Sequence, residues 1–339
     1  MNILLTGGAG YIGSHTCVTL QNVGHRVVIL DNFCNSDRAV VPAIQTITGV
    51  APTLVDGDVR NIDLVVHTLT QHRIDAVIHF AAHKSVEESL RHPVKYYDNN
   101  VGGLVALLQA MDTSQCRQLI YSSSAVVYGT SQKSPLRESS ALESRNPYAH
   151  TKLIGEDMLA ALSKADASWR LAILRYFNPV GAHPSGLIGE HPQGVPNNLM
   201  PYVSQAAIGA LPFVKIFGDD YATADGTGVR DFVHVMDIAE GHASAISKLE
   251  SAAGSRQFTV NLGTGQGHSV REVIRAYSVA CGKDIPVQVE ARRDGDVAEC
   301  YADVSSAASL LNWKSSRTLN EICADSWRWQ KSNPTGFSV

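Results

Sequence analysis

The chain has 339 residues, of which 44% are hydrophobic and 18% charged, and its formal net charge at pH 7 is −4. This length is enough for one large or two moderate domains, and the slightly negative charge excludes an electrostatic nucleic-acid binder. The six cysteines form no CxxC pair and no ligand-like cluster, so they predict a reducing compartment and no metal site. With no charged leader, no cleavage site and no membrane-length apolar run, we expect a soluble, cytoplasmic protein without a membrane partner.

Short apolar runs alternate with helically spaced segments through the first half of the chain. The runs at 2–6, 26–31, 52–55, 75–82, 118–124 and 170–177 predict strands, and the segments at 12–23, 61–72, 93–112 and 148–164 predict helices. Nearly continuous apolar strands separated by helices indicate a parallel sheet covered on both faces. The predicted fold is therefore a doubly wound α/β sheet of Rossmann type.

The composition changes after residue 177. Residues 178–201 are rich in Gly, Pro and Asn, which is typical of a functional loop. Helical spacing returns at 235–249 and 269–281, with a strand predicted between them at 258–263. We expect a Rossmann-type domain over 1–177, to which the chain returns around 231–262, and a smaller mixed α/β domain over 178–339.

A glycine-rich stretch, TGGAGYIG at residues 6–13, follows the first predicted strand and opens the first helix. Gly7, Gly10 and Gly13 permit a tight turn and the close approach of a pyrophosphate to the backbone amides. The N-terminus of the following helix favours the same negative charge. The stretch predicts a dinucleotide site, and the alternative is a purely structural turn.

The second predicted strand ends in Asp31, 18 residues after the last of these glycines. A carboxylate there can hydrogen-bond the adenosine ribose hydroxyls and would repel a 2′-phosphate, so it favours NAD over NADP. The alternative is a turn residue at a strand end. Asn32, Asn35 and Ser36 supply further polar groups around that ribose, and Asp58 is placed either to meet the adenine amine or to cap a helix.

The stretch NPYAHTK places Tyr148 four residues before Lys152, so that both side chains share one face of a helix. Asn146 is a suitable helix cap, and Pro147 suits the first turn. Because ligands bind at the carboxyl ends of parallel strands, we expect Ser124 and Tyr148 to converge on one substrate hydroxyl. An ammonium about 5 Å away lowers a phenol pKa by about 2 units, toward the range of a general base, and an oxidised nicotinamide would add to this. Taken alone, the pair is also typical of a solvated surface helix.

These features together resemble the extended short-chain dehydrogenase/reductase family. Longer strings, among them YYDNNVGG (96–103), SSSAVVYG (122–129), RYFNPVGAHPSG (175–186) and DGTGVRDFVHVMD (225–237), are similar to the UDP-hexose 4-epimerases within it. The resemblance covers nearly the whole chain. It implies a tightly held NAD, reversible epimerisation at C4 of UDP-galactose and UDP-glucose through a transient 4-keto sugar, and a homodimer.

The resemblance also assigns roles to individual residues. Tyr148 would take the proton of the sugar 4-hydroxyl, and Lys152 would hydrogen-bond the nicotinamide ribose. Arg230 and Arg293 would pair as cations for a diphosphate, where the alternative is two surface arginines. The further cofactor contacts it implies are Tyr11, Ile12, Val59, Phe80, Ala81, Lys84, Asn99, Ser122 and Phe177. The further contacts to the UDP-sugar are Asn178, Asn198, Leu199, Phe217, Asp296 and Cys300.

Cys300 is small where family members limited to glucose and galactose carry a tyrosine. The resemblance therefore implies that UDP-GlcNAc and UDP-GalNAc are also accepted. The alternative is a buried apolar thiol, with the N-acetyl group blocked by another side chain. The chain also departs from the family pattern at His83, Ser85 and Glu87, which flank Lys84. We interpret them as tolerated neighbours, and the alternative is that they retune the cofactor or the sugar site. His150 and Thr151 depart as well, and we expect them to have little effect.

Two other functions stay open. A 4,6-dehydratase or a decarboxylase acting on nucleotide sugars also oxidises C4, but a dehydratase needs an acid and a base where this chain has Ser124-Ala125-Val126. A non-catalytic, NAD-sensing protein would typically lack Tyr148 or Lys152, and this chain has both.

Overall fold

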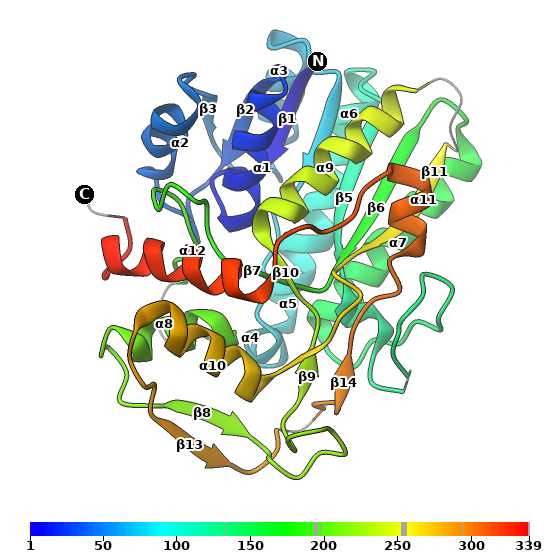
Figure 1. Ribbon diagram of the computed structural model, residues 1–339. Helices are drawn as coiled ribbons and strands as arrows, with labels where there is room; N and C mark the ends of the chain where they lie inside the picture. The colour runs from blue at the N-terminus through cyan, green and yellow to red at the C-terminus, as the bar shows by residue number, and fades with distance from the viewer. Residues whose placement is uncertain (132, 193–195, 197, 252–255, 294, 338–339) are drawn as a thin grey trace.

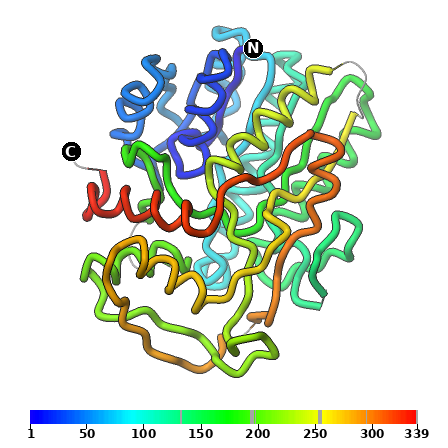
Figure 2. Tube along the Cα trace, viewed as in Figure 1, coloured from blue at the N-terminus to red at the C-terminus, as the bar shows by residue number. Residues whose placement is uncertain are grey.

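The computed structural model describes residues 1–131, 133–192, 196, 198–251, 256–293 and 295–337, and a seven-stranded parallel sheet is its largest element (Figures 1 and 2). The strands lie in the order β11-β6-β5-β4-β1-β2-β3, and each neighbouring pair runs parallel. The predicted doubly wound α/β fold is confirmed. The strands are β1 (Asn2–Thr6), β2 (Arg26–Asp31), β3 (Thr53–Asp56), β4 (Ala76–His79), β5 (Gln118–Ser124), β6 (Arg170–Tyr176) and β11 (Gln257–Leu262).

Hydrophobic cores lie on both faces of this sheet. Ile3 and Leu5 of β1 face one core and Leu4 faces the other, because successive strand side chains point to opposite faces. This is why the strands are apolar almost throughout. The first core is covered by α1 (Tyr11–Asn22), α2 (Val40–Thr48), α9 (Val235–Glu250) and α11 (Ser305–Leu311), and the second by α3 (Ile62–Gln71), α6 (Gly103–Thr113) and α7 (Pro147–Ala165).

A smaller body lies beyond the carboxyl ends of the strands, in the lower half of Figure 1. It has its own hydrophobic core, built from residues of α8, α10, α12 and β8. β14 pairs with β9 beside this body, and β7 pairs with β10. The elements are β7 (Asn178–Val180), α8 (Leu199–Ala207), β8 (Val214–Phe217), β9 (Val229–Arg230), β10 (Phe232–His234), β12 (His268–Ser269), α10 (Val270–Cys281), β13 (Val287–Glu290), β14 (Glu299–Cys300) and α12 (Leu319–Ser332).

The structure differs from the predicted elements between the fourth and fifth strands of the chain. β4 ends at His79 instead of residue 82, and a loop leads from it into α4 (Val86–Arg91). The single helix predicted over 93–112 is three pieces: α5 (Pro93–Tyr96), a π-helical turn (Tyr97–Gly102) and α6. Such wide turns recur at functional sites, and this one carries Asn99 and Asn100. No helix in the described part of the chain is long and apolar enough to cross a membrane.

Candidate active site

The tyrosine and the lysine lie one turn apart at the start of α7, as their spacing predicts. The Asn146 side chain accepts a hydrogen bond from Ala149 N at 2.8 Å, and Pro147 is the first residue of the helix. This cap fixes the residue at which the helix begins. Tyr148 is thereby held in the first turn, where it shares a hydrogen bond with Ser124 at the end of β5.

Burial dominates the ionisation of Tyr148. It raises the pKa of the phenol above 10.0, and the hydrogen bond with Ser124 and the charge of Lys84 lower it only in part. Ser124 and Tyr148 therefore lie beside each other, and their convergence on one substrate hydroxyl stays a prediction. The charge of Lys84 lowers the pKa of the phenol. The effect expected of Lys152 on the phenol stays a prediction.

Lys152 is held against the backbone of β5. Its ammonium donates to Ser122 O at 2.6 Å and lies 5.1 Å from the centre of the Tyr121 ring, and the residue is only 4% exposed. Burial lowers the pKa of Lys152 to about 8, and the charge of Glu156 raises it in part. The ammonium is thus fixed at the strand end by a carbonyl.

Lys84 lies on the loop after β4 and is paired with a residue that the sequence analysis missed. Its Nζ is 3.1 Å from Glu190 Oε1, and the charge of Glu190 raises the pKa of Lys84. Asn198 Nδ2 donates to the same carboxylate oxygen at 3.4 Å. Glu190 therefore joins a predicted cofactor residue to a predicted substrate residue. A lone Glu in a Gly- and Pro-rich loop gives no local signal of this contact.

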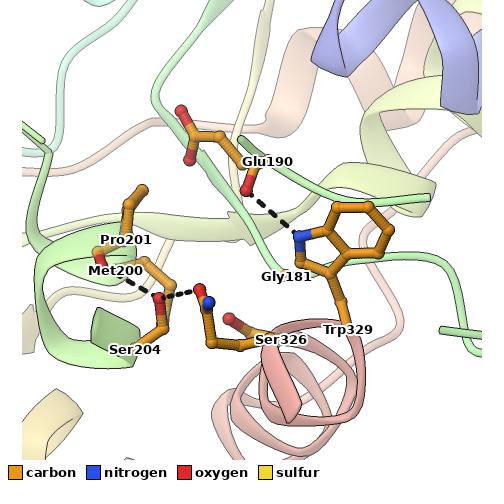
Figure 3. A pocket seen from close by; sticks show the side chains of 8 residues that line it. Gly181, Glu190, Met200, Pro201, Ser204, Ser326 and Trp329 are labelled. Carbon is orange, nitrogen blue, oxygen red and sulfur yellow. Dashed lines mark hydrogen bonds between the residues drawn. The ribbon is translucent and has the colours of Figure 1, made fainter. Parts of the chain in front are cut away.

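The loop that carries Glu190 is anchored by α12. The Trp329 indole donates to Glu190 O at 3.2 Å, while the Glu190 carboxylate points away from the ring (Figure 3). Gly189 leaves the room for that indole, since a Cβ at this position would lie 2.3 Å from Trp329 Cγ. Ser204 Oγ donates to Gln330 Oε1 at 2.8 Å and so ties α8 to α12. Both residues line a small pocket together with Glu190 and Trp329.

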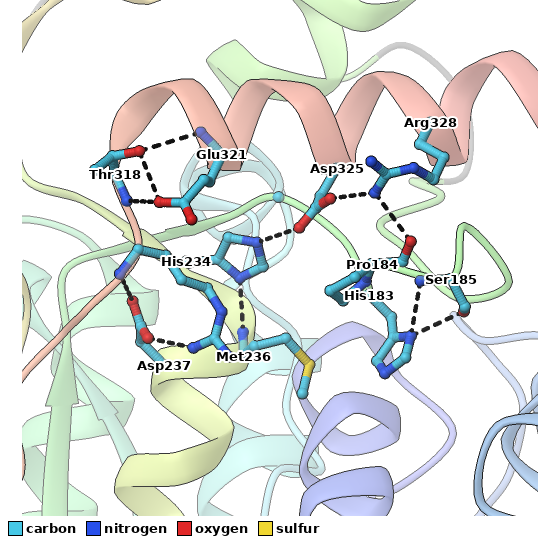
Figure 4. Close-up of polar contacts among 12 residues, drawn as sticks. His183, Pro184, Ser185, His234, Met236, Asp237, Thr318, Glu321, Asp325 and Arg328 are labelled. Carbon is cyan, nitrogen blue, oxygen red and sulfur yellow. Dashed lines mark hydrogen bonds and ion pairs between the residues drawn. The ribbon is translucent and has the colours of Figure 1, made fainter.

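A second set of contacts holds the start of this loop (Figure 4). His234 Nδ1 accepts from Met236 N at 3.0 Å, so Nε2 carries the proton and donates to Asp325 Oδ2 at 3.2 Å. Asp325 also pairs with Arg328, whose guanidinium donates to Pro184 O at 2.9 Å. The C-terminal helix thus positions the segment that leads to Glu190.

The glycine turn has the tight geometry that its motif predicts. Gly7 has φ +69°, and a Cβ on it would lie 2.7 Å from Ala81 N. A Cβ on Gly13 would lie 2.6 Å from Gly7 O. Gly10 precedes α1 and provides no side-chain cap, so the first N–H groups of the helix keep their capacity to bind an anion.

Asp31 is a fixed carboxylate beside this turn. It is 7% exposed and accepts hydrogen bonds from Ala9 N at 2.9 Å, Phe33 N at 2.9 Å and Ser36 Oγ at 2.8 Å. The oxygens of Asp31 order the turn, as the interpretation of Asp31 as a turn residue expects. The contact of Asp31 with the ribose stays a prediction. A turn without room for side chains, an uncapped helix N-terminus and a fixed carboxylate together fit NAD.

Asp58 lies near the same end of the site. Asn32 Nδ2 donates to Asp58 Oδ2 at 3.0 Å, and Arg60 pairs with Asp58 at 2.8 Å, which lowers the pKa of the carboxyl to about 2. The cap of α3 is Asn61, which accepts from Leu64 N at 3.1 Å. The helix-cap interpretation of Asp58 is therefore wrong.

The residues predicted to hold the diphosphate lie together in the smaller body. Asp296 Oδ1 is 3.4 Å from Arg230 and Oδ2 is 3.2 Å from Arg293, so one carboxylate joins the two guanidinium groups. The Arg293 guanidinium stacks 4.5 Å from the centre of the Phe217 ring. Two cations within reach of one anion are suited to binding a diphosphate.

Cys300 stands between this cationic group and the end of β5. It is opposite Arg230 in the β14–β9 pair, and its carbonyl accepts from Asp231 N at 3.0 Å. Its side chain packs beside the cluster of Tyr128 and Phe177, which also includes the two residues after Ser124. The backbone at position 300 is therefore held by β9, while its side chain packs beside the apolar cluster.

The other predicted contacts take varied positions. The Tyr11 hydroxyl donates to Gly181 O at 2.7 Å, and the Phe80 ring lies 5.0 Å from His242. Several predicted residues lie in or against the hydrophobic clusters: Ile12, Val59, Ala81, Phe177 and Leu199. Asn35 and Asn178 are exposed, and Asn99 Nδ2 donates to Asn100 Oδ1 at 2.9 Å.

Asn100 and Thr151 join the loop that carries Lys84 to the first turn of α7, which carries Tyr148. The Asn100 amide accepts from His83 N at 2.8 Å and donates to His83 O and Thr151 Oγ1, both at 3.0 Å. The Thr151 hydroxyl donates to Tyr148 O at 2.8 Å. Thr151 contributes its hydroxyl to these bonds, whereas His83 contributes only its backbone N and O. The interpretation of these two departures from the family pattern stays a prediction.

The glycine turn, Asp31 and the Ser124–Tyr148–Lys152 group define a class of NAD-dependent enzymes that work on a hydroxyl or a carbonyl. The chain belongs to the NAD dependent epimerase/dehydratase family, whose model matches residues 3–263. Its relatives specify the class further. The chain is 49% identical to the UDP-glucose 4-epimerase of Bacillus subtilis (strain 168), over 99% of each chain.

Solved structures agree with this placement. The UDP-glucose 4-epimerase from Stenotrophomonas maltophila, with bound NAD and formylated UDP-arabinopyranose, has a TM-score of 0.96 and 50% identity over 98% of each chain. The enzyme from Bifidobacterium longum, in complex with NAD+ and UDP, has a TM-score of 0.95 and 46% identity over 99% of this chain and 100% of that one.

Proposed function

We propose that the chain interconverts UDP-galactose and UDP-glucose by reversible, NAD-dependent epimerisation at C4. The observation that carries this proposal is the hydrogen-bonded pair of Ser124 and Tyr148 at the carboxyl end of β5, in a chain that matches UDP-glucose 4-epimerases over its whole length. The reversible hydride transfer that bound NAD supplies leaves the cofactor unconsumed.

The residues of the chain move the proton and hold the sugar. Tyr148 accepts the 4-hydroxyl proton as C4 is oxidised and returns it when C4 is reduced, while Ser124 hydrogen-bonds the same sugar oxygen. Because burial raises the pKa of the phenol, the cationic surroundings that stabilise its ionised form are needed for this role. Lys84 is one such group, and the buried Lys152 orients the nicotinamide ribose.

The same site is proposed to accept UDP-GlcNAc and UDP-GalNAc. The sugar must turn over between the two hydride transfers, and a 2-N-acetyl group needs room during that movement. Cys300 offers a small side chain beside Arg230 and the Phe177 cluster, where this movement takes place. Its backbone is fixed, so the size of this side chain determines the available space.

A homodimer is proposed from the resemblance and from apolar residues exposed on three neighbouring helices. Leu90 on α4, Val94 on α5 and Val105 on α6 are 61%, 77% and 37% exposed. Burying such residues between two copies is favourable. Light scattering on the purified protein and on Val94→Glu tests this, and a monomeric parent protein would refute it.

The function is tested by incubating the purified protein with UDP-galactose and following the sugar by NMR. UDP-glucose should form without added cofactor, and Tyr148→Phe should lose the activity. A 4-keto-6-deoxy product would instead indicate a dehydratase. That outcome is disfavoured because Ala125 and Val126, which follow Ser124, pack against an apolar cluster and offer no acid or base.

A further inference from the structure

A buried ion pair lies beneath the lysine of the active site. Glu156 follows Lys152 by one turn of α7, and Arg175 lies on β6. The guanidinium contacts the two carboxylate oxygens at 2.6 and 3.0 Å, and the side chains of Arg175 and Glu156 are only 5% and 8% exposed. Nothing in the proposed proton transfer uses this pair.

The same carboxylate also binds the strand that carries the active-site serines. Ser123 Oγ donates to Glu156 Oε1 at 2.5 Å. Its neighbours on β5 hold the two catalytic side chains, since Ser122 O accepts from Lys152 and Ser124 hydrogen-bonds Tyr148. Three consecutive residues of β5 are therefore tied to three positions of α7.

A buried ion pair is weak evidence for stability, because removing two charges from water offsets most of their attraction. A carboxylate in a low-dielectric site does, however, act strongly on a cation one helical turn away. Lys152 needs such support, because burial favours its neutral form. The position of Glu156 is thus explained better by its effect on Lys152 than by stability.

We infer that Glu156 is a positioning residue, whose carboxylate keeps the Lys152 ammonium charged and, through Ser123, holds the end of β5 in register with α7. This inference rests on the proposed function, since it concerns the lysine of that site. Arg175 orients the carboxylate, and is itself held by Tyr128 Oη at 3.0 Å and Glu138 O at 3.1 Å.

The other titratable groups around Lys152 do not supply this charge. Burial lowers the pKa of His79 on β4 to about 3 and raises the pKa of Tyr121 on β5 and of Tyr176 on β6 above their ordinary values, so all three are neutral near pH 7. Burial also raises the pKa of Tyr148 on α7. Glu156 is the carboxylate that raises the pKa of Lys152.

The test compares Glu156→Gln with Asp157→Asn, which removes the same charge from the exposed neighbouring position. The ionisation of Lys152 is followed by NMR on protein with 13Cε-labelled lysine, and its signal is assigned by Lys152→Arg. The midpoint should fall by about one pH unit in Glu156→Gln, as expected for a lost charge at this distance, and stay unchanged in Asp157→Asn. The alkaline limb of kcat/KM for UDP-galactose should move down by the same amount.

Two further variants separate charge from folding. Glu156→Gln leaves Arg175 buried without its partner, so the double variant Glu156→Gln/Arg175→Gln is measured as well. It should show a smaller downward shift, because the Arg175 cation, which opposes the charge of Lys152, is lost together with the carboxylate. Ser123→Ala keeps the carboxylate, and should lower kcat while leaving the midpoint of Lys152 in place.

An unchanged midpoint in both Glu156 variants, an equal shift in Asp157→Asn, or an unmoved alkaline limb would each overturn the inference. The NMR titration needs no substrate. A parent protein that fails to convert UDP-galactose would therefore refute the proposed function, while the titration still decides the role of Glu156.

Discussion

Replacing Cys300 by tyrosine should separate the two pairs of sugars on which the enzyme is proposed to act. The parent protein is expected to interconvert UDP-GlcNAc and UDP-GalNAc as well as UDP-glucose and UDP-galactose. The substitution adds a phenol ring to a site whose backbone is paired with β9 and whose neighbours Tyr128 and Phe177 are 0% and 6% exposed. The buried neighbours leave little room for the ring on their side, so we expect it to take up space in the proposed sugar site.

The size of the effect follows from overpacking. Extra bulk against groups that cannot move costs about 1 to 3 kcal/mol, which corresponds to about 5- to 150-fold in kcat/KM. The buried neighbours and the fixed strand place Cys300→Tyr near the upper end, so activity on the N-acetyl pair should fall about 100-fold. Activity on the glucose–galactose pair should change by less than about threefold, because the 2-hydroxyl of these sugars is much smaller than an N-acetyl group.

The assay measures kcat/KM for both pairs on the parent protein, on Cys300→Tyr and on Cys300→Ser as a matched control. The serine variant keeps the small size and should retain both activities. Equal losses on both pairs in Cys300→Tyr, or a parent protein without N-acetyl activity, would refute the steric reasoning.

The remaining predictions concern the cofactor and the base. NAD should copurify with the protein and be released on denaturation, and Asp31→Asn should reduce the amount recovered; a nucleotide-free protein that works only with added NADP would contradict this. Tyr148→Phe should lower kcat by about 100- to 10,000-fold while UDP binding, measured by calorimetry, is retained, and near-normal turnover would exclude Tyr148 as the base. Lys84→Met removes a cation that lowers the pKa of Tyr148, so this pKa rises and the acidic limb of kcat/KM should move to higher pH; an unmoved limb would refute the electrostatic role. Asn100→Ala loses three hydrogen bonds to His83 and Thr151 and should lower the free energy of unfolding by about 3 kcal/mol in urea titrations, with no change arguing against the clamp.

Features encoded by neighbouring residues were predictable from the sequence. The alternation of apolar strands and helices predicted the parallel sheet, because the spacing of apolar residues depends only on residues that are close in sequence. The cap at Asn146 and the turn at Gly7 also depend on a few adjacent residues. The predicted strands and most of the predicted helices have the predicted type in the structure, with ends that differ by only a few residues, whereas the helix predicted over 93–112 is in three pieces.

Contacts between distant segments were not predictable in this way. Lys84 meets Glu190 across 106 positions, and β8 pairs with β13, although each segment alone shows only a short apolar or polar pattern. α2 was missed because its sequence, VVPAIQTIT, is rich in β-branched residues that disfavour helices, and its packing on α1 outweighs that preference. The resemblance to a family supplied Asn198 and Arg293, which local patterns do not reveal.

Lys152 and Lys84 differ in burial, and this difference suits them to different proposed roles. Lys152 is almost fully buried and bound to a backbone carbonyl, so it has one position and one partner, and its charge depends on Glu156. Lys84 has a side chain that is 51% exposed, pairs with Glu190 at 3.1 Å and lowers the pKa of the phenol. The proposed reaction needs a cation that lowers the pKa of a buried tyrosine and a second one that holds the nucleotide in one orientation. Lys84 meets the first need through its charge. The fixed position of Lys152 suits the second, which is the role proposed for it.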